Sequence, residues 1–203
     1  LVADINSVKH VVPMLSLENS YNEEDLNDFD KQIRKLCNIN EGEKIEYAVE
    51  PKFDGGSIAL YYENDVLVRA ATRGNGVDGE EITANMRVLS SIPLRVPFSA
   101  KGITKVELRG EALIKKDTFK KVNATREEEG LVLFANPRNA ATGGLRTKNP
   151  QETKSRGIEA FIFQMGFAVD ENNNSVFDKY NTHFGNIEMM GELGFKIPIK
   201  EKK

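Results

Sequence analysis

The fold is decided around residues 50–73, where the chain reads EPKFDGGSIALYYENDVLVRAATR. Two apolar and aromatic runs, 56–62 and 66–73, flank the polar pair Asn64-Asp65. This pattern predicts a β-hairpin, because two turn-forming residues between such runs favour a tight connection. The residues just before the hairpin, Glu50–Gly55, carry the side chains of greatest chemical interest.

The rest of the chain mixes strand and helix patterns. Residues 105–114 alternate as a strand, with Glu107, Arg109 and Glu111 on one face. Hairpins and separate helices without regular βαβ alternation predict an α+β fold, with antiparallel sheets and flanking helices, in one domain spanning residues 1–203. We also expect helices at residues 20–37, from Asn136-Pro137 onward and at about 182–193, and a long apolar strand at 158–169.

A glycine-rich stretch, RGNGVDG, occupies residues 73–79. Its spacing differs from the G-x-G-x-x-G pattern of dinucleotide-binding folds, so we interpret it as a tight loop. Asp78 and Glu81 stand three apart, as in a capping box, and predict a helix that begins there. That helix would carry an apolar stripe of Ile82, Met86 and Leu89.

The overall composition is that of a globular protein. The chain has 203 residues, 39% of them hydrophobic and 29% charged, and a net charge of −3 that gives no indication of a nucleic-acid partner. No apolar run approaches the roughly 18 residues needed to span a bilayer, and we expect no export signal. One cysteine, Cys37, allows no internal disulfide. We therefore expect a cytoplasmic protein, without membrane association, that is monomeric.

The lysine at position 52 lies between two carboxylates. In an extended chain, side chains two residues apart share a face, so Glu50, Lys52 and Asp54 point the same way. One interpretation is a solvated charged face, and the other is a nucleophilic lysine. A lysine amine attacks only when it is unprotonated, yet neighbouring carboxylates favour its protonated form. A nucleophilic Lys52 would therefore need activation from cations elsewhere or from a bound metal.

Lys-x-Asp-Gly, here at residues 52–55, is the signature of the covalent nucleotidyltransferases, which include DNA ligases, RNA ligases and mRNA capping enzymes. Further stretches in the same order make residues 10–194 resemble the adenylation domain of bacterial NAD-dependent DNA ligases. These stretches are HVVPMLSLEN (10–19), ATRGNG with GEE (71–81), ELRGE (107–111) and FANPRNAA with GLR (134–146).

The resemblance implies that Lys52 attacks the α-phosphorus of NAD, expels nicotinamide mononucleotide and keeps AMP. AMP then passes to the 5′-phosphate of nicked double-stranded DNA, and the neighbouring 3′-hydroxyl displaces it. Asp54 corresponds to a catalytic residue that orients the lysine or a metal-bound water. Glu50 corresponds to the residue that reads the adenine, and Ser16 and Leu17 correspond to residues that line the AMP site.

Four more residues receive roles from the resemblance. Glu111 matches an acidic residue near the ribose and the metal, although an ordinary cross-strand ion pair would show the same pattern. Arg73 matches a nucleotide-phosphate contact, and Arg138 and Arg146 match DNA contacts. Taken singly, each arginine could equally be an ordinary surface residue. On one continuous helix, Arg138 and Arg146 would lie roughly 80° apart and could line one groove.

The resemblance also shows what the chain lacks. We find no match to the N-terminal nicotinamide-mononucleotide module, the fifth motif, the OB-fold, the zinc element or the helix-hairpin-helix repeats, so we expect a truncated core. The implied cofactors are NAD and Mg²⁺, with Zn²⁺ only in the absent part. Little self-adenylation is expected of the isolated chain.

Two other classes of protein were weighed against this one. A truncated fragment could bind adenine nucleotide or DNA without catalysis. ATP-dependent ligases and capping enzymes share the lysine signature, but the stretches at 11–17 and 136–141 argue against them.

Overall fold

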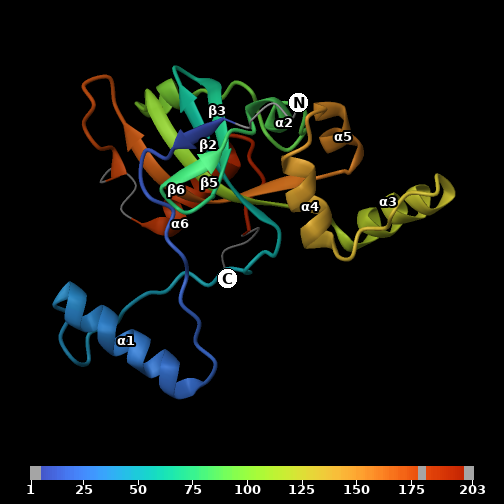
Figure 1. Ribbon diagram of the computed structural model, residues 1–203. Helices are drawn as coiled ribbons and strands as arrows, with labels where there is room; N and C mark the ends of the chain where they lie inside the picture. Colours follow the sequence, from blue (N-terminus) through green and yellow to red (C-terminus); the bar gives the residue numbers. More distant parts are fainter. Residues whose placement is uncertain (1–5, 178–181, 199–203) are drawn as a thin grey trace. The chain divides into compact units, whose positions relative to one another are not determined.

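A computed structural model describes residues 6–177 and 182–198 of the chain. The chain divides into two compact units, one of residues 1–14 with 50–203 and one of residues 15–49. We call them the sheet unit and the inserted unit. Figure 1 shows the elements of both, and each unit is described by itself.

A four-stranded sheet forms the centre of the sheet unit, and all its neighbouring strands are antiparallel. A two-stranded sheet pairs β1 (Ser7–Lys9) with β4 (Asp78–Glu80). Together with the helices, this confirms the predicted α+β class. The strand order of the large sheet is β3 (Val66–Thr72), β2 (Gly56–Glu63), β5 (Lys105–Leu113) and β6 (Glu159–Val169).

The predicted hairpin is confirmed as β2 and β3. Asn64 and Asp65 connect the two strands with φ of 49° and 69°, both in the left-handed region. Two positive φ values are what a two-residue turn of type I′ requires, and asparagine and aspartate tolerate them better than most residues. The hairpin therefore forms from local chemistry.

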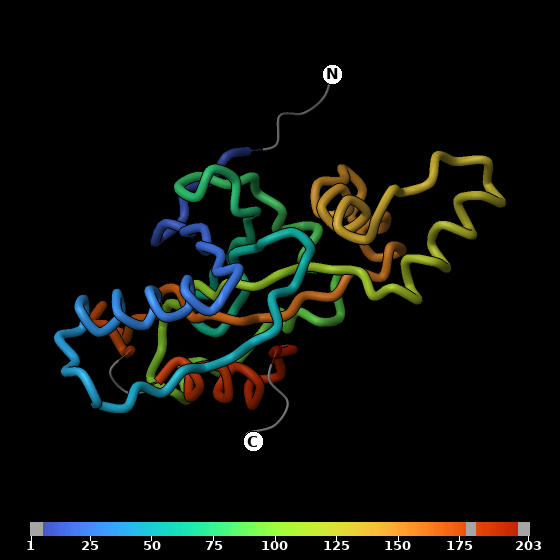
Figure 2. The backbone as a smooth tube through the Cα atoms, turned by 90° about the horizontal axis from the view of Figure 1, so that it is seen from below, coloured from blue at the N-terminus to red at the C-terminus, as the bar shows by residue number. Residues whose placement is uncertain are grey.

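Short helices cover the sheet (Figures 1 and 2). Helix α6 packs against β6, and helix α4 packs against β5 and β2. Both helices were predicted, and both start at side-chain caps. Asn136 accepts from the backbone N–H of Asn139, and Thr182 accepts from that of Gly185. The bounds are α2 (Thr83–Met86), η1 (Phe98–Lys101), α3 (Lys116–Glu128), α4 (Pro137–Leu145), α5 (Pro150–Ser155) and α6 (His183–Glu192).

The core lies between the sheet and these helices. Tyr62 is fully buried, and its ring meets those of Phe98 and Phe195 at centroid distances of 5.3 and 5.8 Å. The Tyr62 hydroxyl donates to the carbonyl of Pro93, so its burial leaves no unpaired polar group. By contrast, α3 projects beyond the sheet and buries none of its residues.

The capping box predicted at Asp78 is wrong. Asp78–Glu80 is strand β4, and the helix begins later, after Ile82, which makes no side-chain cap. The N–H of Asp78 donates to the Asn75 side chain, within a loop closed by pairing to β1. That partner strand is remote in sequence, so a local pattern did not reveal it. The predicted apolar stripe of Ile82, Met86 and Leu89 is nevertheless buried, as expected of core residues.

The charged face of β5 is covered rather than solvated. Glu107 is 1% exposed and Arg109 is 6% exposed. Both bind residues 7–14, a segment that we call the strap. Glu107 accepts from the N–H of Val11, and the Arg109 guanidinium donates to the carbonyls of Val12 and Pro13.

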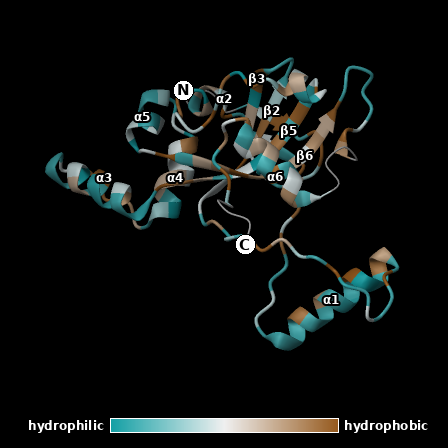
Figure 3. Ribbon diagram, turned by 180° about the vertical axis from the view of Figure 1, so that it is seen from behind, coloured by the Kyte–Doolittle hydropathy of each residue, from teal (hydrophilic) through white to brown (hydrophobic). Residues whose placement is uncertain are grey.

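The inserted unit contains helix α1 (Glu23–Cys37), which confirms the predicted helix with its start slightly later than expected. Asn22 caps it by accepting from the N–H of Asp25. Tyr47 packs near Phe29 and donates its hydroxyl to Asp30. No residue of α1 is buried, and hydrophobic patches are visible along its mainly hydrophilic ribbon in Figure 3.

Candidate functional site

The segment before β2 lies directly against β5. A Cβ added to Gly55 would come within 2.1 Å of the carbonyl oxygen of Ala112, a separation that no side chain could occupy. A Cβ on Gly56 would meet Leu145 of α4 at 2.8 Å. Glycine at these two positions lets the backbone approach both a strand and a helix closely. The Lys-x-Asp-Gly signature is therefore fixed to the sheet at its glycine end.

Glu111 of β5 holds the same segment by its side chain. One carboxylate oxygen accepts from the N–H of Gly55 at 3.0 Å and the other from the hydroxyl of Ser57 at 2.8 Å. Burial raises the pKa of Glu111, and the hydrogen bonds from Ser57 and Gly55 and the charges of Lys52 and Arg138 oppose that rise. Glu111 therefore contacts the lysine segment directly through Gly55, three residues after Lys52.

Lys52 itself is exposed. None of the hydrogen bonds and ion pairs within the described part of the chain uses its ammonium group. The next side chain, Phe53, packs against Phe161 of β6 with ring centroids 4.8 Å apart. The backbone at Lys52 is thus anchored through Phe53 while its amine faces solvent.

Asp54 joins the lysine segment to α4. Its carboxylate lies 3.4 Å from the guanidinium of Arg138, with both side chains well exposed. An exposed ion pair contributes little to stability. The pair nevertheless shows that Arg138, in the first turn of α4, lies beside the segment that carries Lys52.

Arg138 lies within helix α4, whereas Arg146 is the C-cap residue that follows it. Helix α4 ends at Leu145, and Arg146 lies beyond it with φ −109° and ψ 10°. The Asn85 side chain donates to the carbonyls of Leu145 and Thr147 and so fixes this helix end. Arg146 pairs with Glu80 of β4 at 2.6 Å. The separation of roughly 80° holds only for one continuous helix, so it does not apply to this pair.

Arg73 stands at the start of the glycine-rich loop, and its side chain is exposed. Its N–H donates to the carbonyl of Ser57, while its own carbonyl accepts from the N–H of Gly76. Gly74 and Gly76 have φ of 57° and 94°, which supports a tight loop rather than a dinucleotide-binding turn. Arg73 is therefore fixed by its backbone next to β2, which follows the lysine segment.

Ser16 and Leu17 belong to the inserted unit, where both are exposed. They therefore lie in a different unit from Lys52, and their predicted role beside AMP stays a prediction.

One residue near the predicted site was missed. The imidazole Nε2 of His183, the first residue of α6, lies 2.5 Å from a carboxylate oxygen of Glu50. No spacing rule could have joined His183 to Glu50, since 133 residues separate them.

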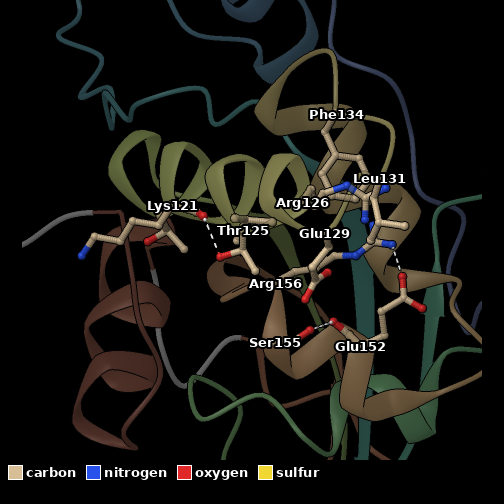
Figure 4. Close-up of a pocket in the computed structure, with 11 residues that line it drawn as sticks. Lys121, Thr125, Arg126, Glu129, Leu131, Phe134, Glu152, Ser155 and Arg156 are labelled. Atoms are coloured by element: carbon tan, nitrogen blue, oxygen red, sulfur yellow. Dashed lines mark hydrogen bonds and ion pairs between the residues drawn. The ribbon is translucent and has the colours of Figure 1, made fainter.

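A pocket of about 690 Å³ lies elsewhere, between α3, α5 and the loop before α4 (Figure 4). The ring of Phe134 is held there between two guanidinium groups, those of Arg126 at 4.1 Å and Arg156 at 4.6 Å. Arg156 also donates to the carbonyl of Ala140 in α4. None of the predicted site residues lines this pocket, which we regard as part of the support of α4.

Within residues 6–177 and 182–198, no helix is long and apolar enough to cross a membrane. Over the same ranges, no group of three or more histidine, cysteine, aspartate or glutamate side chains could hold a metal ion.

A lysine segment fixed on an antiparallel sheet, with a carboxylate and an arginine beside it, is the arrangement expected of the covalent nucleotidyltransferase class. Comparison with known proteins gives the family. A sequence profile of the NAD-dependent DNA ligase adenylation domain matches residues 2–203, and the chain belongs to that family.

Curated relatives agree with the profile. The chain is 52% identical over 204 residues to a DNA ligase of Persephonella marina and 46% identical over 197 residues to one of Aquifex aeolicus. These alignments cover 100% and 97% of this chain but only 28% and 26% of the two relatives. The chain therefore spans about a quarter of the length of the ligases that it matches, and matches their adenylation domain.

Proposed function

We propose that this chain is the adenylate-accepting core of an NAD-dependent DNA ligase, with Lys52 as the nucleophile. The observation that carries the proposal is that the lysine segment is held by Glu111 through Gly55 and lies beside Arg138 through Asp54, in a chain of this family. The Lys52 amine, once it has lost a proton, forms a nitrogen–phosphorus bond to the α-phosphorus of NAD. The bond from that phosphorus to the nicotinamide mononucleotide breaks, and AMP remains on the lysine.

The other residues around Lys52 receive supporting roles in this proposal. Glu50 accepts a hydrogen bond from the adenine amine, while Arg73 contacts nucleotide phosphate. Arginine suits phosphate because its charge is permanent and its donors can bind two oxygens at once. Asp54, held toward Arg138, orients the lysine. From the inserted unit, Ser16 and Leu17 line the AMP site.

Mg²⁺ is proposed as the activating cation. This ion is commonly held by one or two carboxylates together with substrate phosphates. Glu111 fits that description, because it is half-buried beside Lys52, and each of its oxygens keeps a lone pair after its hydrogen bond. Bound there, the ion would offset phosphate charge and favour the neutral amine.

The later steps need nicked double-stranded DNA as the partner, and we propose Arg138 and Arg146 as its phosphate contacts. AMP leaves Lys52 for the 5′-phosphate of the nick, and the adjacent 3′-hydroxyl then displaces AMP to close the strand. The protein is proposed to act in the cytoplasm as a monomer during DNA replication and repair.

The test is a chimera in which this chain replaces the matching segment of the Persephonella marina ligase. Radiolabelled adenylate from NAD should become covalently attached to the chimera, and nicked DNA should be sealed. Lys52→Ala should abolish both activities, whereas Lys120→Ala, at an exposed position on α3, should leave them unchanged. Undiminished labelling of the Lys52→Ala chimera would contradict the proposal, as would labelling from ATP but not from NAD.

The exposure of Lys52 favours a second candidate for the 203-residue chain alone, which is binding of adenine nucleotide without reaction. Within the described residues, the Lys52 amine makes no hydrogen bond and no ion pair that would hold it in one position. We expect little labelling of the isolated chain by NAD. Efficient labelling that Lys52→Ala removes would contradict this candidate.

A further inference from the structure

The contact between His183 and Glu50 joins the start of a helix to the segment that carries Lys52. The Glu50 side chain is 18% exposed and the His183 side chain 46% exposed, so the pair lies at the rim of the sheet unit rather than in its core. An ionised carboxylate can only accept hydrogen bonds. The imidazole Nε2 must therefore be the donor, and one oxygen of Glu50 is the acceptor.

The position of His183 is set by core packing. Helix α6 buries Ile187, Met189 and Met190 against the sheet, and Thr182 caps its first turn. The chain after the helix is tied back to β6 where the N–H of Ile162 donates to the carbonyl of Lys196. The imidazole is thus presented to Glu50 by a fixed helix.

Fixing one oxygen of Glu50 has a chemical consequence for purine recognition. Adenine offers a 6-amino group, which donates to a carboxylate. Hypoxanthine and guanine instead offer a 6-oxo group, which repels it, and an N1–H, which donates. A carboxylate that can rotate freely could adapt to either purine class, because it could move from the 6-position to N1. A carboxylate held by a neighbouring donor cannot make that movement without losing a charge-assisted hydrogen bond.

We infer that His183 is a specificity-determining residue that positions Glu50 toward the 6-amino group of adenine and against 6-oxopurines. This inference rests on the proposed function, since it assumes that Glu50 reads the base. His183 acts through the Glu50 carboxylate, and the second oxygen of that carboxylate accepts from the adenine amine.

The test uses the 203-residue chain titrated with AMP and with IMP up to millimolar concentrations, followed by NMR chemical shifts. The wild-type chain should bind AMP more tightly than IMP. His183→Ala should reduce the AMP-to-IMP preference about tenfold, the equivalent of one charge-assisted hydrogen bond. His183→Gln retains an N–H donor and should keep part of the preference. Glu188→Ala, an exposed change on the same helix, should leave it intact.

A double-mutant cycle separates positioning from a general loss of structure. If His183 acts through Glu50, the His183→Ala effect on preference should vanish in a Glu50→Gln background. Circular dichroism melts of each variant establish that it is folded.

Two results overturn the inference in different ways. If AMP binds and the preference is the same in His183→Ala and the wild type, His183 has no role in specificity and the proposed function stands. If the wild-type chain binds neither AMP nor IMP, the proposed adenylate site is wrong, and this inference is wrong with it.

Discussion

Glu107 and Glu111 lie on the same face of strand β5, four residues apart, and their surroundings differ. Glu107 is fully buried and is paired with Arg109, at 3.5 Å, in a closed contact with the strap. Glu111 is partly open and holds the lysine segment through Gly55 and Ser57. One alternating strand therefore anchors two remote stretches of chain. We call the Glu107 position the closed end of the strand and the Glu111 position its open end. The closed end stabilises the fold, whereas the open end leaves a partly exposed carboxylate next to the lysine segment.

The largest expected effect is at the closed end. Glu107→Ala would leave the buried guanidinium of Arg109 without its carboxylate, and removing one partner of a buried pair costs about 3–5 kcal/mol. We expect a loss of this size in the free energy of unfolding, measured by urea denaturation. Glu111→Ala, at the open end, should cost clearly less. If Glu107→Ala and Glu111→Ala lowered the free energy of unfolding equally, the two carboxylates would not differ in their contribution to stability.

The next effect concerns the fit of the lysine segment at the open end. Gly55→Ala places a methyl group 2.1 Å from the carbonyl oxygen of Ala112, and overpacking of this kind costs about 1–3 kcal/mol. We expect a lower midpoint of urea unfolding and, in the chimera, loss of adenylate labelling. Gly143→Ala is the matched control, since a methyl group on this exposed glycine in α4 would meet only the Arg156 guanidinium, at 3.3 Å rather than 2.1 Å. If Gly55→Ala changed neither the midpoint of urea unfolding nor the labelling, the lysine segment would not be fixed against β5.

The smallest effect is a pH dependence at Glu111. Burial raises the pKa of Glu111 above its ordinary value of 4.5, so the folded state holds the proton more tightly than the unfolded state. The stability that the carboxyl contributes is therefore full below about pH 4.5 and is lost as the pH rises through the folded-state pKa. Relative to Glu111→Gln, the wild type should lose free energy of unfolding as the pH rises above about 4.5.

Glu159 of the neighbouring strand β6 provides the control for this titration. Burial acts to raise the pKa of Glu159, but hydrogen bonds and charges from Lys196 and Lys115 outweigh it and lower the pKa below 4.5. Relative to Glu159→Gln, the wild type should lose stability as the pH falls below about 4.5. This pH dependence is opposite to that of Glu111, where stability is lost as the pH rises. If the difference in free energy of unfolding between the wild type and Glu111→Gln does not change with pH above about 4.5, burial does not raise the pKa of Glu111.

Features that depend on neighbours in sequence were predictable. The hairpin turn at Asn64-Asp65 and the helix cap at Asn136 each follow from one or two side chains acting on the adjacent backbone. The family was also predictable, because four motifs occur in a fixed order along the chain. The α+β class followed from hairpins and separate helices that show no regular βαβ alternation.

Features that depend on distant partners were not predictable. The capping box at Asp78 failed because β1, far upstream, pairs with that stretch. Burial of Glu107 and Arg109 was missed because the strap that covers them shows no pattern of its own. His183 was missed because its only partner in the site comes from another part of the chain. The roles given to Lys52 and its neighbours remain predictions that the labelling experiment tests.

The residues on either side of the inserted unit are held by the strap and by the His183 contact. The N–H of Met14, just before this unit, donates to the carbonyl of Gly76, and Glu50, just after it, is held by His183. Residues 15–49 are therefore connected to the sheet unit at two positions, Met14 and Glu50, and each of these residues is held by a hydrogen bond. Because the entropy of closing a loop grows only slowly with its length, natural insertions or deletions within residues 15–49 should leave the sheet's stability nearly untouched.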